Sequence, residues 1–130
     1  MRWLGLAALL LMLAGAALPC CAAFKFRDGN ELYDDCFSKD AGRHGLCVGY
    51  VMAVVDVAGV DAQSDGSGSF LYGAHRWCMP IASLPGVARD APERVTDIVA
   101  GYLRDNPDRR FLAADVAVAE ALARVWPCRR

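Results

Sequence analysis

Four cysteines follow residue 23, and this even set constrains the possible folds more than any other feature of the sequence. They are Cys36, Cys47, Cys78 and Cys128. In an exported chain of this size an even number of cysteines predicts disulfides, here two, although the sequence alone leaves all three pairings open. Zinc ligands usually come in close pairs such as C-x-x-C, and no two of these cysteines form one, so we expect no metal site.

The disulfide prediction depends on export, which the first 23 residues indicate. One basic residue, Arg2, precedes an apolar run from Trp3 to Leu18, and a patch of small residues ends at Ala23. This order is typical of a cleavable secretory signal peptide, and we expect cleavage after Ala23 or Ala22. The run is also short for a membrane span, which needs roughly 20 apolar residues.

Two alternatives to cleavage are disfavoured by the residues around this junction. A retained anchor would normally be followed by a basic stop-transfer cluster, and none follows Leu18. Lipid attachment at Cys20 or Cys21 would place Pro19 or Cys20 before the modified cysteine, where lipoproteins have Gly, Ala or Ser. The sequence therefore favours release into an oxidising compartment.

The remaining residues, 24–130, have the length of one ordinary domain. The whole chain has 14 basic and 15 acidic side chains, and only Arg2 of these lies in the predicted signal. Such a slightly acidic domain has no charge pattern for binding nucleic acid or an anionic membrane surface.

Hydrophobic periodicity predicts an all-α domain, a small disulfide-stapled bundle of about four helices. Apolar residues recur at helical spacing in four stretches, at residues 29–38, 46–58, 90–103 and 111–126. Asp28 and Glu31 have the spacing of a capping box before the first stretch, and Asp90 with Pro92 is typical of a helix start before the third. We expect no strand and no second domain.

Gly49 lies inside the second predicted helix, where glycine costs roughly 1 kcal/mol relative to alanine. A close helix crossing at this point would explain the glycine, and a merely tolerated glycine is the alternative.

Helical periodicity disappears between Gly59 and Trp77, and the glycine- and serine-rich run at residues 64–69 predicts a flexible loop tip. Three apolar residues, Phe70, Leu71 and Tyr72, follow this tip at once. They either pack on the domain or contact a partner.

The residues of this chain do not predict catalysis. His44 and Cys47 are a conceivable nucleophilic pair, but Cys47 lies on an apolar helix face, and a buried or disulfide-bonded sulfur is not a thiolate nucleophile. Phosphate-binding loops, H-E-x-x-H and G-x-S-x-G are missing from the sequence. We therefore expect no enzyme activity, no cofactor and no small-molecule substrate.

Several short motifs occur in a distinctive order along the chain. They are Gly29-Asn30-Glu31-Leu32, Cys47-Val48-Gly49-Tyr50, Cys78-Met79-Pro80, Tyr102-Leu103 with Pro107, and Trp126-Pro127-Cys128. Together they resemble the Rap/Tai family of type VI secretion amidase immunity proteins over nearly all of residues 24–130.

The resemblance implies a small all-helical periplasmic protein that functions as a toxin inhibitor. Its partner would be a cognate peptidoglycan amidase effector delivered by neighbouring bacteria, whose active-site cleft it would bind and occlude. The resemblance also implies a homodimer. An inhibitor of this kind needs no chemistry of its own.

In this family a protruding loop enters the amidase cleft, and the resemblance places that loop between Ser64 and Trp77. The candidate partner-binding residues are Phe70, Leu71, Tyr72, His75, Arg76 and Trp77. Packing of Phe70 and Trp77 in the core is the alternative. The segment Ser83–Ala91 is longer and richer in Gly and Pro than the family pattern, and it is the second candidate surface.

Helix order predicts which cysteines pair. In an up-and-down bundle the first two cysteines lie at one end and the last two at the other, which predicts disulfides Cys36–Cys47 and Cys78–Cys128. A periplasmic helical stress or chaperone-like protein without a toxin partner is the alternative function. An adjacent amidase gene would favour immunity over this alternative.

Overall fold

The computed structural model describes residues 25–65, 68–80 and 90–129. The predicted signal peptide and most of the Ser83–Ala91 segment lie outside the described residues. The described elements are α2 (Gly29–Cys36), α3 (Ala41–Asp65), β1 (Phe70–Tyr72), β2 (His75–Trp77), α4 (Ala91–Asp105), the 3-10 helix η2 (Pro107–Phe111) and α5 (Ala114–Val125). The domain is mostly helical, but the prediction of an all-α fold is corrected by this small antiparallel sheet.

Helix α2 begins with the predicted capping box. One carboxylate oxygen of Asp28 accepts hydrogen bonds from the backbone N–H groups of Asn30 and Glu31, each at 3.0 Å. In return the Glu31 carboxylate accepts from the backbone N–H of Asp28, also at 3.0 Å. Both ends of the motif are thus satisfied, which fixes the start of the helix.

Helix α3 is longer than the periodicity predicts at both ends. It begins at Ala41 because the carboxylate of Asp40 accepts a hydrogen bond from the backbone N–H of Arg43 at 2.8 Å, which caps the first turn. It continues beyond Gly59 to Asp65. A Cβ at Gly59 would lie 3.1 Å from the Phe70 ring, so this glycine serves close packing and does not end the helix.

The expectation that the chain has no strand is wrong, while residues 66–67 of the predicted loop tip lie outside the described residues. Strands β1 and β2 pair antiparallel, with Phe70 opposite Trp77, Leu71 opposite Arg76 and Tyr72 opposite His75. Three-residue strands are too short for a period-two pattern to reveal them in the sequence.

The fourth predicted helix, at residues 111–126, begins later in the structure than periodicity predicts. Helix η2 ends at Phe111 and α5 begins at Ala114, because the backbone between them pairs with the chain before α2. Leu112 accepts a hydrogen bond from the backbone N–H of Gly29, and Ala114 donates one to the carbonyl of Arg27, both at 3.0 Å. This long-range pairing replaces the first residues of the predicted helix.

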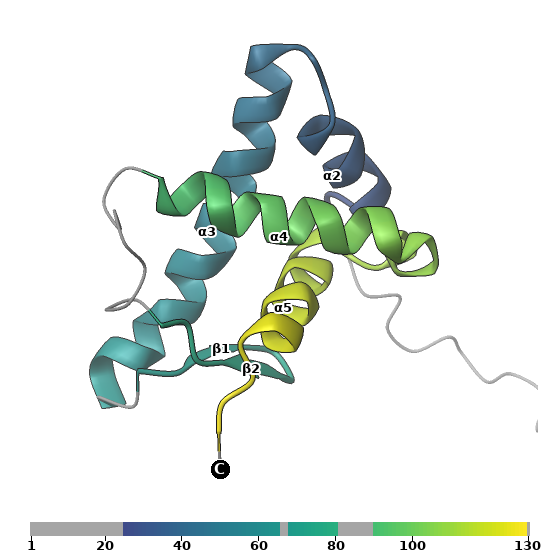
Figure 1. Cartoon of the computed structure of the whole chain (residues 1–130). Helices are drawn as coiled ribbons and strands as arrows, with labels where there is room; N and C mark the ends of the chain where they lie inside the picture. Colours follow the sequence, from purple (N-terminus) through teal and green to yellow (C-terminus); the bar gives the residue numbers. More distant parts are fainter. Residues whose placement is uncertain (1–24, 66–67, 81–89, 130) are drawn as a thin grey trace, which may run out of the picture.

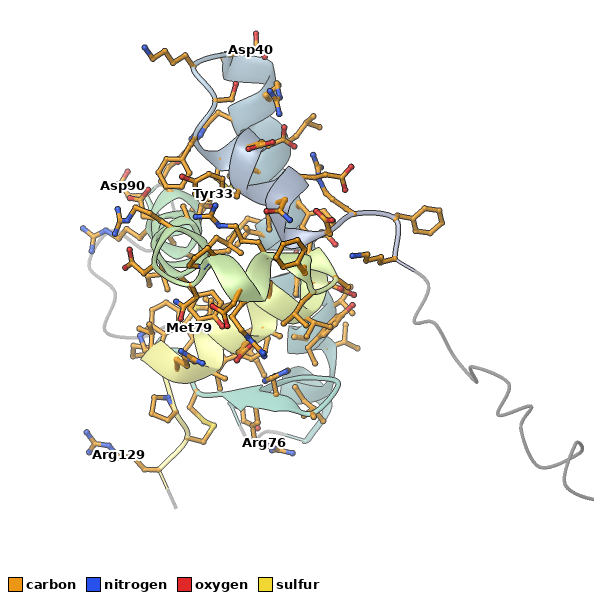
Figure 2. All side chains as sticks on the ribbon, turned by 90° about the vertical axis from the view of Figure 1, so that its right-hand side faces the viewer. Tyr33, Asp40, Arg76, Met79, Asp90 and Arg129 are labelled. Atoms are coloured by element: carbon orange, nitrogen blue, oxygen red, sulfur yellow. A yellow bond between two sulfur atoms is a disulfide. The ribbon has the colours of Figure 1, made fainter. Side chains whose placement is uncertain are left out.

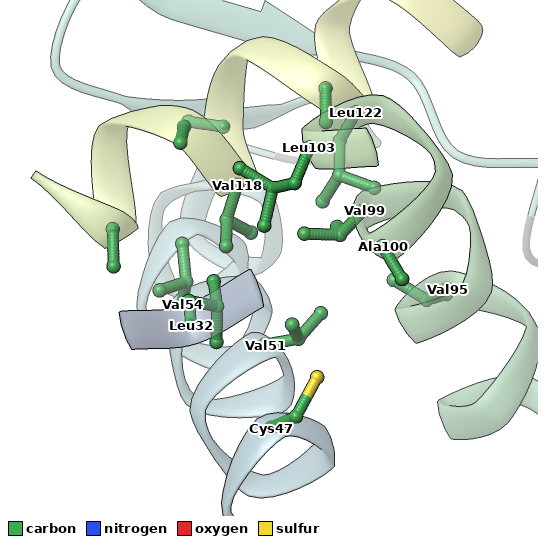
Figure 3. Close-up of a cluster of buried hydrophobic side chains, with 14 of the residues drawn as sticks. Leu32, Cys47, Val51, Val54, Val95, Val99, Ala100, Leu103, Val118 and Leu122 are labelled. Carbon is green, nitrogen blue, oxygen red and sulfur yellow. The ribbon is translucent and has the colours of Figure 1, made fainter. Parts of the chain in front are cut away.

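The core lies where the four helices meet (Figure 3). It contains Leu32 from α2, with Cys47, Val51 and Val54 from α3, Val95, Val99 and Leu103 from α4, and Val118 and Leu122 from α5. Helix α4 runs across α3 and does not lie alongside it (Figure 1). The arrangement therefore departs from a simple up-and-down bundle.

Two disulfides connect Cys36 to Cys47 and Cys78 to Cys128. This is the pairing that helix order predicts. The first bond joins the end of α2 to the beginning of α3, and the second joins the residue after β2 to the segment after α5.

Candidate partner-binding surface

The β1–β2 hairpin carries all six residues predicted to bind a partner. Its two-residue turn, Gly73-Ala74, begins with Gly73 at a φ of 57°. Glycine adopts this left-handed conformation without steric cost, which permits the tight connection between the strands. Alternate residues of each strand point to opposite faces, so the hairpin has an inner and an outer face.

The inner face of the hairpin belongs to the core. Phe70 and Trp77 are both buried, and their rings stack with centroids 5.6 Å apart. These two side chains hold the hairpin on the domain and present no surface to a partner. Phe70 and Trp77 were predicted either to bind a partner or to pack in the core, and the structure supports core packing.

Tyr72 is half-buried on the same face and is tied to α5. Its hydroxyl donates a 2.6 Å hydrogen bond to the carboxylate of Asp115. This bond is the main cause that raises the pKa of Tyr72 to about 12, with burial and the negative charge of Asp115 adding to it. Burial, followed by the Asp115 charge, also raises the pKa of the neighbouring Tyr50.

The outer face carries the accessible members of the predicted set. Leu71 is half-buried and lies opposite the exposed Arg76, whose guanidinium donates a 2.9 Å hydrogen bond to the hydroxyl of Ser69. Figure 2 shows Arg76 at the end of the molecule opposite Asp40. Arginine is enriched among the residues that dominate protein interfaces, and leucine is not, so Arg76 is the stronger candidate of the two.

The base of the hairpin is fixed to the end of the chain. The backbone N–H of Cys78 donates a 2.8 Å hydrogen bond to the carbonyl of Trp126, next to the disulfide to Cys128. An open hollow of about 650 Å³ adjoins this connection. It is lined by Cys78, Pro80, Val125, Trp126, Pro127 and Arg129.

Sequence reasoning did not include this hollow in the candidate site. Its residues come from two segments about 50 positions apart, which the Cys78–Cys128 disulfide and the backbone hydrogen bond from Cys78 to Trp126 bring together. The terminal W-P-C motif could have indicated this region. Because Cys128 directly follows Trp126 and Pro127, its disulfide to Cys78 places these two residues beside Cys78.

A buried charge cluster missed by sequence reasoning lies at the opposite end of the domain. Asp35 of α2 is only 3% exposed and forms ion pairs with Arg27 and Arg43, the latter at 2.8 Å. The cluster joins the segment before α2 to the first turn of α3. A buried carboxylate needs such partners, so we assign these residues a structural role.

The described residues do not assemble a catalytic pair from His44 and Cys47. Cys47 is fully buried and disulfide-bonded, and the ring of His44 contacts the carbonyl of Cys36 at 3.1 Å and the carboxylate of Glu93 at 3.5 Å. In the same ranges of the chain, no three His, Cys, Asp or Glu side chains gather where they could hold a metal ion.

The fold defines a class of protein, a small disulfide-linked helical domain with a two-stranded hairpin fixed to its helices. The chain matches the sequence model of the Rap1a immunity proteins over residues 28–128, and it belongs to this family. The predicted resemblance is thereby confirmed, and membership implies binding of a cognate toxin effector. No curated protein and no solved structure matches the chain.

Proposed function

We propose that this protein is a periplasmic immunity protein that binds a type VI secreted peptidoglycan amidase and occludes its active-site cleft. Membership of the Rap1a immunity family carries the toxin-binding part of the proposal. The amidase as the toxin, type VI delivery and a homodimeric inhibitor are inferred from the resemblance of the sequence motifs. The signal-like residues 1–23 and the two disulfides support an oxidising compartment.

The outer face of the hairpin is the surface that we propose for contact with the toxin. Three observations support it: the hairpin is fixed at its base by a disulfide, held at Tyr72 by Asp115, and anchored by two buried aromatic rings. Such a pre-organised element loses little conformational entropy on binding. Leu71 and Arg76 then supply the contacts, while His75 lies opposite Tyr72 on the inner face, next to the turn.

The proposal predicts an amidase gene beside the gene of this chain, and that amidase, purified in its active form, provides the test. We expect the mature protein to capture it, and Leu71→Ser combined with Arg76→Glu to weaken binding at least about tenfold, since a central interface residue typically contributes 2 kcal/mol or more. Arg94→Glu, an exposed charge reversal on α4, is the matched control and should bind like the wild type.

Each result of this experiment has a distinct meaning. Equal binding by the hairpin variant and the wild type would exclude the hairpin as the contact surface and favour the Ser83–Ala91 segment. If neither the wild type nor any variant binds the amidase, this would contradict the immunity function itself. It would favour the helical stress or chaperone-like alternative. Thermal melting of each variant confirms that the fold is retained.

A further inference from the structure

The two disulfides of this domain lie in different surroundings. Cys36 is 7% exposed and Cys47 is fully buried, and both belong to the hydrophobic core. Cys78 and Cys128 are half-buried and lie outside the core cluster of the described residues. Thiol–disulfide exchange requires a thiolate to reach one sulfur of the bond, so its rate depends on access. In the folded domain the Cys78–Cys128 bond is therefore the accessible one.

The open hollow of about 650 Å³ provides a route to this bond, because Cys78 is one of its lining residues. Pockets that hold small ligands have volumes of about 300–1,000 Å³, so the hollow has more room than a single thiol group needs. Cys128 does not line the hollow. A group that enters the hollow therefore meets the bond from the side of Cys78.

Arg129 gives the hollow a positive charge. This residue directly follows Cys128, it is exposed, and Figure 2 shows it projecting away from the helices. No acidic side chain is among the described residues that line the hollow. The attacking sulfur in disulfide exchange is an anion, and the departing sulfur becomes one, so a neighbouring cation favours both the approach and the departure.

We propose that Cys78–Cys128 is a thiol–disulfide exchange site whose co-reactant is a protein dithiol of the C-x-x-C class. One thiolate of the dithiol attacks the sulfur of Cys78 and forms a mixed disulfide, while the sulfur of Cys128 leaves as a thiolate beside Arg129. The second thiol of the dithiol then attacks the mixed disulfide and releases Cys78. Two electrons pass to the Cys78–Cys128 bond, the dithiol is oxidised to a disulfide, and its two protons end on Cys78 and Cys128.

Two features favour a protein dithiol over a small thiol. Apart from Cys78 and Arg129, the hollow is lined by apolar side chains, those of Pro80, Val125, Trp126 and Pro127. A polypeptide that carries the attacking cysteine can cover these side chains, whereas a small polar thiol leaves them in contact with water. A dithiol also completes the exchange in one encounter, because its second thiol is already beside the mixed disulfide.

Exchange at this site loosens the base of the hairpin and leaves the core in place. The bond joins the residue after β2 to the segment after α5, while the stacked rings of Phe70 and Trp77 hold the hairpin from its inner face. Reduction therefore releases residues 78–80 and keeps the buried Cys36–Cys47 bond. The consequence for toxin binding rests on the proposed function, whereas the exchange itself does not.

Reduced thioredoxin, regenerated by dithiothreitol, tests the site on the mature protein without denaturant. We expect Cys78–Cys128 to be reduced at least about tenfold faster than Cys36–Cys47, since the buried bond is reached only when the core opens locally. Alkylation of the new thiols followed by peptide mapping measures both rates, and circular dichroism checks that the fold is retained. Dithiothreitol alone at the same thiol concentration should be slower.

A charge reversal tests the part played by Arg129. We expect Arg129→Glu to slow reduction of Cys78–Cys128 at least about threefold, because an anion then lies where the thiolates form. Arg94→Glu, the exposed charge reversal on α4, is the matched control and should leave the rate unchanged.

A thioredoxin variant whose second active-site cysteine is replaced by serine identifies the attacked sulfur independently. Without its second thiol the mixed disulfide cannot resolve, and we expect mass spectrometry to find it on Cys78. The proposal is overturned if the trapped bond is on another cysteine, if both disulfides are reduced at the same rate, or if dithiothreitol alone is as fast as thioredoxin.

The effect on toxin binding is measured separately. Protein reduced and alkylated at Cys78 and Cys128 should bind the amidase at least about tenfold more weakly than the oxidised protein, because the released hairpin base must be ordered again on binding. Equal binding by the two forms would overturn the link between this site and the hairpin. Failure of the oxidised wild type to bind would instead contradict the proposed function, and the reduction rates would be unaffected.

Discussion

The contact between Tyr72 and Asp115 shows how single residues hold the candidate site in place. The hydroxyl of Tyr72 donates a 2.6 Å hydrogen bond to a carboxylate on a different element, and this bond couples the hairpin to α5. A hydrogen bond to a charged group typically contributes about 1.5–3 kcal/mol to the free energy of unfolding. The structure therefore gives Tyr72 a structural role, whereas the sequence interpretation made it a candidate partner-binding residue.

Replacing Tyr72 by phenylalanine tests this coupling. We expect Tyr72→Phe to destabilise the domain by about 1–2 kcal/mol at neutral pH, measured by urea unfolding. Because the folded pKa of Tyr72 is raised to about 12 from 10, the stabilisation is complete below pH 10 and is lost as the pH rises toward 12. The difference between variant and wild type should thus shrink across this interval, and a constant difference would contradict the assignment.

Gly29 provides a second test at the residue scale. A Cβ at this position would lie 2.8 Å from the Cα of Arg110 and 2.9 Å from its carbonyl oxygen, both backbone atoms of η2. We expect Gly29→Ala to cost about 1–3 kcal/mol because the backbone must shift. Gly101→Ala in α4 meets only the flexible end of Arg104 at 3.9 Å and should gain about 0.5–1 kcal/mol. Equal effects of the two substitutions in thermal melting would refute this.

At the scale of elements, the two disulfides restrict the unfolded chain to different extents. The Cys78–Cys128 bond spans 50 positions and the Cys36–Cys47 bond spans 11. Loop-closure entropy increases with loop length, so the longer bond is expected to stabilise the domain by about 1 kcal/mol more. The longer bond also fixes the base of the hairpin, which links stability to the candidate site.

Paired cysteine-to-alanine variants measure this difference. We expect loss of Cys78–Cys128 to lower the free energy of unfolding by about 3–4 kcal/mol and loss of Cys36–Cys47 by about 2–3 kcal/mol. The first variant should also make the hairpin amides exchange faster with deuterated solvent, while the second should leave them protected. The opposite order in both measurements would contradict the proposed role of the longer bond.

Sequence periodicity predicted the elements whose stability is local. The capping box of Asp28 and Glu31 and the extent of α4 are set by neighbouring residues, and both agree with the structure. The hairpin, the continuation of α3 past Gly59 and the start of α5 at Ala114 depend on contacts between distant segments. A local pattern contains no information on such contacts, so the glycine of a close packing contact was interpreted as the end of a helix.

The six residues predicted to bind a partner lie in two different environments. All six predicted residues lie on the hairpin, yet alternation along two short strands separates them into an inner and an outer face. Phe70 and Trp77 are in the core, while Leu71 and Arg76 are accessible. Because aromatic residues are common in both cores and interfaces, composition alone does not distinguish these two environments.

At the scale of the whole molecule, the hairpin is held by α5 and the terminal disulfide, and its Arg76 lies at the end of the molecule opposite Asp40 (Figure 2). We expect each protein chain to bind one toxin molecule through this hairpin. The mass of the complex in light scattering measures this ratio, and two chains per toxin would contradict a contact made by one hairpin.

Titration of amidase activity tests the central claim most directly. Purified peptidoglycan fragments are digested by the neighbouring amidase while the mature protein is added in increasing amounts. We expect activity to fall linearly and to reach zero at one protein chain per amidase, because an occluded cleft admits no substrate. Full hydrolysis in the presence of excess, correctly folded protein would contradict the proposal that this chain is the immunity protein of that toxin.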